Sequence, residues 1–79
     1  MKIRMLYFAV LASAAGCDAE SVQTTCDSAA ELYDELAVRH GFSLTRSCLR
    51  VAVNGVFAPW EQHLCEGDEV ALLPPVSGG

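Results

Sequence analysis

The clearest structural signals in this chain lie in its last twelve residues, Asp68-Glu69-Val70-Ala71-Leu72-Leu73-Pro74-Pro75-Val76-Ser77-Gly78-Gly79. A short aliphatic run between turn-forming residues, here Val70 to Leu73, is typical of a buried strand. Pro74 has no backbone N–H to donate to a sheet, and each proline disfavours helix at the residue before it. We therefore predict a strand over residues 70–73 and an extended tail over residues 74–79.

The predicted tail has the properties of a segment that enters a narrow site. Six extended residues span roughly 20 Å, at about 3.3 Å for each residue. Gly78 and Gly79 lack a Cβ atom, so they fit where any other residue would be obstructed. A frayed terminus is the alternative, because the last residues of most domains are poorly ordered. The proline spacer and the Gly-Gly ending favour instead a reactive carboxylate on Gly79.

The composition indicates one small acidic domain. The chain has 79 residues, of which 52% are hydrophobic, and this proportion supports a small core and excludes a disordered protein. Ten acidic residues against five basic ones give a net charge of -5. Because no basic patch is present, we expect no binding to nucleic acid or to a membrane surface, and the charge suits a basic protein partner. No apolar run approaches the ~18 residues of a membrane-spanning helix.

The cysteines and histidines do not form a metal-binding motif. No C-x-x-C spacing occurs, and the two histidines are isolated from each other in the sequence. We therefore predict neither a metal site nor a bound cofactor. In a secreted protein four cysteines would indicate disulfides, whereas in the cytosol they are small buried hydrophobes or surface thiols. The residues concerned are Cys17, Cys26, Cys48 and Cys65.

The N-terminal region leaves a secreted alternative open. Residues 1–4 are positively charged, residues 5–12 are apolar, and Ser13-Ala14-Ala15-Gly16-Cys17 resembles the cleavage site of a bacterial lipoprotein. Against an envelope lipoprotein with a signal at residues 1–16, the apolar run is short and contains the bulky Tyr7 and Phe8. Cleavage would also leave about 60 residues without their best strand, a size at which domains need additional stabilisation. We therefore expect a cytoplasmic protein.

Periodicity predicts a first strand over residues 2–11. Alternate residues on both of its faces are apolar after Arg4, as expected for a strand in the middle of a sheet. Residues 12–25 are small and polar, and we predict a loop there in which residues 21–25 pair as an edge strand.

A helix is predicted between Ser28 and Gly41. Ser28 and Glu31 have the spacing of a capping box, and glycine commonly follows the last turn of a helix. The residues that form one apolar stripe are Ala29, Leu32, Tyr33, Leu36 and Ala37. We expect His40 to be a solvated residue at the helix end, where positive charge complements the dipole.

The second half of the chain predicts a hairpin. Residues 51–53 form its first strand, Asn54-Gly55 is a strong signal for a tight turn, and Val56-Phe57 is the return. Pro59 suits the start of a short helical segment over residues 60–64, in which Trp60 packs against the core.

The predicted order of elements indicates an α+β fold. A small mixed sheet carries one main helix across one face. The other face has no helix to cover it, so we expect it to be partly exposed and apolar, which would mark a partner-binding surface.

Three further motifs are distinctive: Val51-Ala52-Val53-Asn54-Gly55, Glu66-Gly67-Asp68-Glu69-Val70-Ala71 and Pro74-Pro75-Val76-Ser77-Gly78-Gly79. Together with the opening from Ile3 to Ala9 and Gly16, they resemble the family of the molybdopterin synthase small subunit, a sulfur carrier related to the thiamine sulfur carrier and to ubiquitin. The resemblance extends over nearly the whole chain. It implies a ubiquitin-like β-grasp domain over residues 1–73 and a reactive C-terminal tail over residues 74–79.

The same resemblance implies a chemistry for the tail. An E1-like partner enzyme would use ATP to adenylate the carboxylate of Gly79, and a sulfur donor would convert it to a thiocarboxylate. The tail, with Gly78 beside the reactive end, would then deliver sulfur to a cyclic pyranopterin phosphate in the large synthase subunit and so form the molybdopterin dithiolene. The spacer that enters the partner active sites would be Pro74, Pro75, Val76 and Ser77.

The resemblance also implies an assembly. The partner is the large subunit, and the expected complex is a heterotetramer in which this chain has no independent catalytic site. Phe8 and Leu72 match family positions that form the apolar partner interface. Ala12 and Ser13 stand where many family members have an Arg–Glu pair, so any salt bridge made there is absent or replaced.

Three alternative functions remain open at this point. A sulfur carrier for thiamine or another thiolation pathway would use nearly the same chemistry. A ubiquitin-like protein modifier would form isopeptide bonds through Gly79, although only Lys2 or the N-terminus could support chains of the modifier itself. An envelope lipoprotein would be an interaction module without sulfur chemistry.

Overall fold

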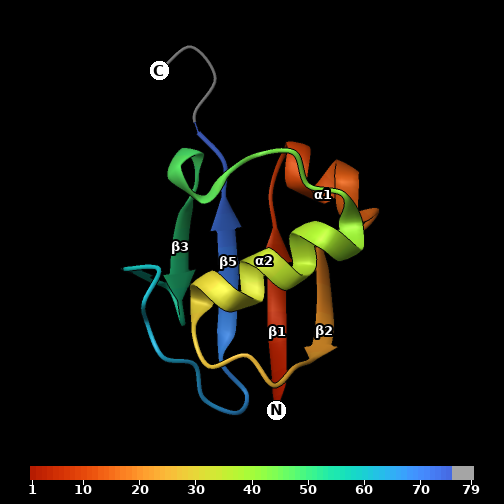
Figure 1. Cartoon of the computed structure of the whole chain (residues 1–79). Coiled ribbons are helices and arrows are strands. Elements are labelled where there is room, and N and C mark those ends of the chain that lie inside the picture. Colours follow the sequence, from red (N-terminus) through yellow and green to blue (C-terminus); the bar gives the residue numbers. More distant parts are fainter. Residues whose placement is uncertain (76–79) are drawn as a thin grey trace.

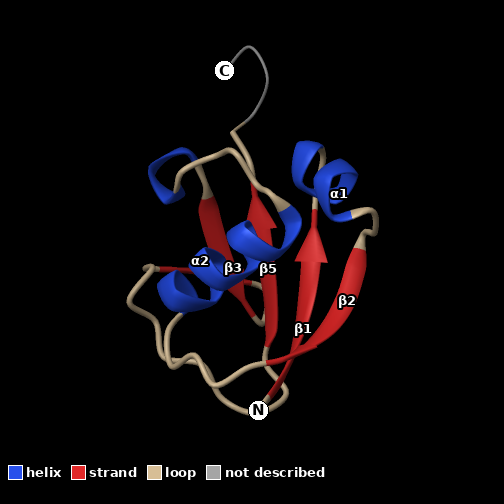
Figure 2. Ribbon diagram, turned by 45° about the vertical axis from the view of Figure 1, so that its right-hand side comes forward, coloured by secondary structure: helices blue, strands red, loops and turns tan. Residues whose placement is uncertain are grey.

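The first strand lies inside a five-stranded sheet, between β2 and β5, in the order β2-β1-β5-β3-β4 (Figures 1 and 2). The computed structural model describes residues 1–75, so the predicted tail residues Val76, Ser77, Gly78 and Gly79 lie outside the described residues. The elements in chain order are β1 (Lys2–Tyr7), α1 (Val10–Ala15), β2 (Ala19–Gln23), α2 (Ala29–His40), the 3-10 helix η1 (Arg46–Cys48), β3 (Arg50–Val53), β4 (Val56–Ala58) and β5 (Glu69–Leu73).

The sheet is mixed. β1 and β5 run parallel, and the other neighbouring strands run antiparallel. α2 crosses one face of this sheet, over β5 and β1 (Figure 1). The predicted α+β arrangement is therefore confirmed, and so is the position of the first strand inside the sheet, with a neighbour on each side. In the part of the chain that the structure describes, no helix has the length and apolar character needed to cross a membrane.

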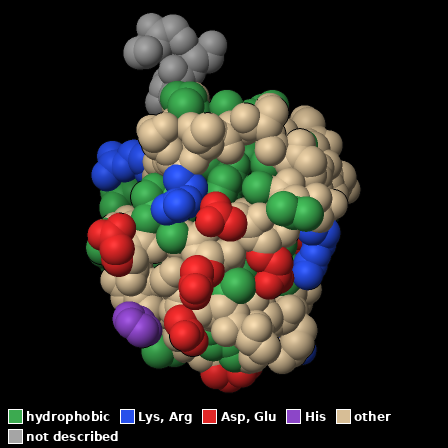
Figure 3. Space-filling model, viewed as in Figure 1, with side chains coloured by type: hydrophobic (Ala, Val, Ile, Leu, Met, Phe, Trp, Pro, Cys, Tyr) green, Lys and Arg blue, Asp and Glu red, His purple; other side chains and the backbone are tan. Residues whose placement is uncertain are grey.

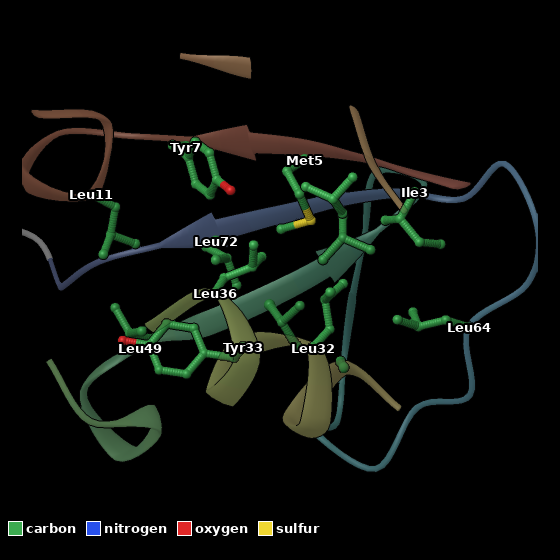
Figure 4. Packing of buried hydrophobic residues seen from close by; sticks show 14 residues of the cluster. Ile3, Met5, Tyr7, Leu11, Leu32, Tyr33, Leu36, Leu49, Leu64 and Leu72 are labelled. Carbon is green, nitrogen blue, oxygen red and sulfur yellow. The ribbon is translucent and has the colours of Figure 1, made fainter. Parts of the chain in front are cut away.

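The core lies between α2 and the covered face of the sheet. Ile3, Met5 and Tyr7 of β1 point toward Leu32 and Leu36 of α2 (Figure 4). All five side chains are at most 2% exposed, and burial of one large apolar side chain stabilises a fold by about 1.5–3 kcal/mol. Cleavage before residue 17 would remove β1 and its three core residues. The packing therefore argues against the lipoprotein alternative.

Local signals set the ends of α2 as predicted. The Ser28 side chain caps the helix by accepting a hydrogen bond from the Glu31 N–H at 3.3 Å. Glu31 reaches back to the N–H of Asp27 at 3.0 Å, one residue earlier than in the usual capping box. Gly41 ends the helix with a φ of +72°, in the left-handed region that favours glycine.

The prediction of a short helix over residues 60–64 is wrong. The carbonyl groups of Trp60 and Gln62 instead accept hydrogen bonds from the N–H groups of Ala30 and Ala29, at 2.9 and 3.1 Å. These donors belong to the first turn of α2, which has no partners for them within its own helix. The segment therefore provides hydrogen-bond acceptors for the first turn of α2 instead of forming a helix of its own. Trp60 packs against the core as predicted, with its ring 5.7 Å from that of Tyr33.

The first strand is shorter than predicted, because it ends at Tyr7 and α1 begins at Val10. Ala9 turns the chain with φ +52° and ψ -125°, a conformation that glycine adopts far more readily than alanine. No Gly, Asn or Pro marks this turn in the sequence, and the apolar run continues through it. The predicted loop over residues 12–25 accordingly contains the end of α1 and all of β2, which is an edge strand as predicted but starts two residues earlier.

Replacing Ala9 with Gly is expected to raise the free energy of unfolding by about 1 kcal/mol. Relief of backbone strain of about 1–3 kcal/mol exceeds the extra entropy that glycine gains in the unfolded chain, about 0.4–1 kcal/mol. Thermal unfolding should show a midpoint about 4–8 °C higher. Ala14→Gly, at an exposed position inside α1, is the control and should lower the midpoint. A lower midpoint for Ala9→Gly would show that the backbone at Ala9 is not strained.

The prediction of a solvated His40 is also wrong. Its side chain is only 15% exposed, and its Nε2 lies 2.7 Å from Oε2 of Glu20 on β2. The same oxygen accepts a hydrogen bond from the hydroxyl of Tyr7 at 2.5 Å. Glu20 thereby joins the end of α2 to the two strands β1 and β2. Sequence spacing gives no sign of this contact, since the three residues are far apart along the chain.

Replacing Glu20 with Gln is expected to lower the free energy of unfolding by about 1–2 kcal/mol near pH 7. Partial burial alone would raise the pKa of Glu20, but the hydrogen bonds from Tyr7 and His40, with the charges of His40 and Arg39, together hold it below its usual value. Its stabilisation is therefore complete above the unfolded pKa, near 4.3, and is lost as the pH falls through the lower folded pKa.

Urea unfolding near pH 7 and near pH 3 tests this dependence on pH. The difference in the free energy of unfolding between wild type and Glu20→Gln should be smaller near pH 3. Glu61→Gln, at an exposed position, should leave stability nearly unchanged at both pH values. A gap for Glu20→Gln that does not change with pH would contradict the assignment.

Candidate functional site

The predicted tail begins at the end of β5, the central strand of the sheet. β5 is hydrogen-bonded on one side to β1 and on the other to β3, and it ends at Leu73. Pro74 and Pro75 follow in neither a helix nor a strand. They leave the sheet at the end where α1 also lies (Figure 1). Because β5 is paired on both sides, the tail starts from a point with little freedom to move.

Leu72 and Leu73 lie on opposite faces of the sheet. Leu72 is 1% exposed, packs in the core and is opposite the buried Val51 and Tyr7. The prediction of Leu72 as a partner-facing residue is therefore wrong, since its side chain is covered by the protein itself. Leu73 is half-buried on the helix-free face, opposite Arg50. Alternation from Val70 along the strand would have found this difference.

The helix-free face of the sheet carries a continuous apolar row. Its members are directly opposite one another on neighbouring strands: Ala19, Leu6, Ala71, Ala52 and Phe57. Phe57 is 56% exposed at one end of the row. Phe8, which the sequence placed at the partner interface, is 44% exposed and lines a hollow together with Leu6 and Ala19. This face is thus partly exposed and apolar, as predicted, whereas its contact with a partner stays a prediction.

A groove lies beside the base of the tail. Leu73, Pro74 and Pro75 line it with apolar surface. Arg50 and Phe57 line it as well, and the guanidinium of Arg50 lies over the ring of Phe57, with 3.9 Å between Cζ and the ring centroid. The other lining residues are Ser47, Cys48 and Leu49. The groove therefore adjoins Pro74 and Pro75, where the predicted tail begins.

Charge differs between the two faces of the sheet. On the α2 side, Arg39 pairs with Glu35 and Arg46 with Asp34, each at 3.3 Å, and further acidic side chains are spread across this side (Figure 3). The strands place Lys2, Arg4 and Arg50, all exposed, on the opposite side, where the exposed Glu69 is directly opposite Arg4. Basic side chains therefore outnumber acidic ones along the strands of the helix-free face.

The described residues offer little chemistry of their own. Within residues 1–75 no three His, Cys, Asp or Glu side chains are grouped to hold a metal ion, and the four cysteines are free. Burial raises the pKa of Cys26, a hydrogen bond from Thr24 opposes this, and contact with Glu35 raises it further. Its thiol is therefore held in the protonated, less nucleophilic form.

The positions that depart from the family pattern lie on α1. Ala12 is half-buried and Ser13 is exposed, and the helix contains no charged residue. None of the three ion pairs found among the described residues involves α1. No salt bridge of α1 therefore replaces the Arg–Glu pair that many family members have at the positions of Ala12 and Ser13.

Comparison with known proteins identifies relatives over the full length of the chain. Residues 5–79 match the model of the ThiS family. The molybdopterin synthase sulfur carrier subunit of Escherichia coli (strain K12) is 34% identical, and the alignment covers 98% of this chain and 99% of that protein. The human protein of the same name is 31% identical, with 99% and 94% covered.

Solved structures confirm the ubiquitin-like β-grasp fold. SAMP1 from Haloferax volcanii has a TM-score of 0.82 and 30% identity, with all of both chains covered. A protein–protein complex of subunits 1 and 2 of the molybdopterin-converting factor from Helicobacter pylori 26695 contains a chain with a TM-score of 0.69 and 22% identity over the full length of both. The ubiquitin of Caldiarchaeum subterraneum has a TM-score of 0.65 at 14% identity, covering 100% of this chain and 98% of its own, so that likeness concerns the fold alone.

Proposed function

The chain belongs to the ThiS family, and from this premise we propose that it is the sulfur carrier subunit of a molybdopterin synthase. The observation that carries the proposal is its similarity, over nearly the full length of both proteins, to subunits of that name. The fold supports it, because the sheet presents a paired central strand that leads directly into the tail.

The proposed chemistry takes place at the carboxylate of Gly79. A carboxylate oxygen attacks the α-phosphate of ATP on an E1-like enzyme, pyrophosphate leaves, and an acyl-adenylate forms. Sulfide, HS⁻, released by a donor then attacks the acyl carbon and AMP leaves, which produces the thiocarboxylate with no change of oxidation state. ATP provides the leaving group that a free carboxylate lacks. The chain thus acts as a co-substrate of its partner enzymes.

The tail then acts as a tether for the thiocarboxylate. Residues 74–79 extend at most roughly 20 Å from the end of β5, and Gly78 and Gly79 are narrow enough for a confined active site. A tethered nucleophile reacts as if at very high concentration, because positioning replaces diffusion. The spacer formed by Pro74, Pro75, Val76 and Ser77 would set the depth at which sulfur meets the cyclic pyranopterin phosphate.

The proposed partner for this step is the large synthase subunit, in a cytoplasmic heterotetramer. The Helicobacter pylori neighbour was solved as a complex of subunits 1 and 2, which supports a two-subunit assembly here. Phe8 and Leu73, at the tail end of the helix-free face, are our candidates for the apolar contact with that subunit.

A ubiquitin-like protein modifier is the second candidate function. It is favoured by the similarity to SAMP1 of Haloferax volcanii, also solved under the name small archaeal modifier protein 1. In this case Gly79 would form isopeptide bonds with lysines of other proteins. Covalent adducts of higher mass that survive boiling with thiol would identify this function.

Mass spectrometry of the C-terminal peptide, from protein isolated with its activating enzyme and sulfur donor, tests the first proposal. We expect one oxygen of Gly79 to be replaced by sulfur, and alkylation to modify that group. Localisation to residues 76–79 separates the product from an oxidised methionine or cysteine. A tail that remains a plain carboxylate under these conditions would overturn the sulfur-carrier proposal.

A further inference from the structure

Arg50 is a charged residue in apolar surroundings at the base of the tail. In the groove described above, it is the one charged side chain among residues that are otherwise apolar or uncharged. It is directly opposite Leu73 across the β3–β5 pair. Its guanidinium lies over the exposed ring of Phe57, 3.9 Å from the ring centroid.

The charge of Arg50 has no acidic partner among residues 1–75. No carboxylate of this part of the chain lies within ion-pair distance, and no side-chain hydrogen bond of Arg50 is present there, in contrast to Arg39 and Arg46. The cation–π contact with the face of the Phe57 ring partly stabilises the charge. Among the described residues the five N–H donors of the guanidinium have no side-chain acceptor, so they can bind another molecule.

Docking of a partner would change the surroundings of this charge. Leu73 and Pro74 line the groove together with Arg50, so we expect a protein that accepts the tail to cover Arg50 as well. Burial of a guanidinium without an acceptor is strongly unfavourable. A carboxylate is the side chain that matches its forked geometry and its charge.

We propose that Arg50, held in place by Phe57, is a specificity-determining residue that pairs with an Asp or Glu side chain at the entrance of the tail-binding site on the large subunit. This inference rests on the proposed function, because it assumes that the large subunit takes up the tail. Stacking on Phe57 restricts the conformations of the Arg50 side chain before binding, so less conformational entropy is lost when the ion pair forms. A partner surface without the acidic residue would be rejected, since it would leave the guanidinium buried and unpaired.

Binding of the full-length chain to the isolated large subunit, measured by calorimetry at low and high NaCl, tests the proposal. Arg50→Leu keeps an apolar side chain in the groove and removes the charge, and we expect affinity to fall at least about tenfold. Arg50→Lys keeps the charge but loses the forked geometry of the guanidinium, and its affinity should lie between those of wild type and Arg50→Leu. Added salt should weaken wild type more than Arg50→Leu, because the ion pair is absent from the variant.

The matched control is Arg39→Leu, which removes the same charge on the α2 side of the sheet. We expect its affinity to stay within about twofold of wild type, since charges far from an interface are screened by salt. Thermal unfolding of each variant checks that the exposed substitutions leave the fold intact. Arg50→Leu binding as tightly as wild type, or more tightly, would show that the groove accepts an apolar partner and would overturn the proposal.

The two proposals fail in different ways. If wild type forms the thiocarboxylate and binds the large subunit, and Arg50→Leu binds equally well, only the role of Arg50 is lost. If wild type does not bind the large subunit at all, the proposed function and the role of Arg50 are lost together.

Discussion

Removal of Gly79 is expected to lower the rate of sulfur transfer at least about 100-fold and to leave the thermal midpoint unchanged. The shortened chain still ends in a glycine carboxylate, but its reacting atoms stop about 3.3 Å short of their target. A misplacement of about 1 Å is enough to cost about 100-fold in rate. Stability should not change, because within residues 1–75, the part that the structure describes, the buried core residues all lie between Ile3 and Leu72.

Measurement of molybdopterin formation with purified large subunit and chemically thiocarboxylated chains checks this result. Ser77→Ala is the matched control, since it alters the tail without changing its length or its last two residues. We expect it to retain most of the activity. Unchanged activity after removal of Gly79 would show that tail length does not position the sulfur, and would contradict the tether.

Leu72→Ala is expected to lower mainly stability, and Leu73→Ala is expected to lower mainly the affinity for the large subunit. Leu72 is 1% exposed in the core, and truncation of such a leucine destabilises a protein by about 2–5 kcal/mol. A loss of about 3 kcal/mol lowers the thermal midpoint of a domain of this size by about 12–24 °C. Leu73 is half-buried on the helix-free face, so its truncation should cost less than about 1 kcal/mol of stability.

Binding to the large subunit separates the two leucines further. Leu73→Ala should weaken it about tenfold, which corresponds to about 1.4 kcal/mol, because the side chain borders the groove at the base of the tail. Leu72→Ala, assayed below its unfolding temperature, should bind nearly as well as wild type. Each variant is the control for the other, and the reverse pattern would place Leu72 at the interface after all.

The candidate site shows where prediction from sequence succeeded and where it did not. The strand over residues 70–73 was evident, as part of β5, because its signal depends on neighbouring residues, whereas the role of the prolines as a spacer stays a prediction. Which leucine faces the partner depends on the alternation of the strand relative to α2, and matching to family positions selected the wrong one, Leu72. Arg50 was missed because nothing in its neighbours along the chain predicts its contact with Phe57.

Local signals are sufficient to predict several elements of the fold. Ser28 and Gly41 set the ends of α2, and Asn54 and Gly55 turn the hairpin with φ values of +53° and +84°. Each of these depends on hydrogen bonds or backbone conformations within a few residues of chain. Such preferences act in the same way in almost any tertiary context, so they can be recognised before the fold is known.

Other elements depend on partners that lie far away along the chain, and they become evident only in the folded protein. Residues 60–64 bond to the first turn of α2, Glu20 joins Tyr7 to His40, and Ala9 adopts a glycine-like turn that leads into α1. In each case the local preference is weak or opposed, and the deciding free energy comes from donors, acceptors and apolar surface contributed by other parts of the chain. Those groups come together only when the core closes, so the segment's own residues do not reveal them.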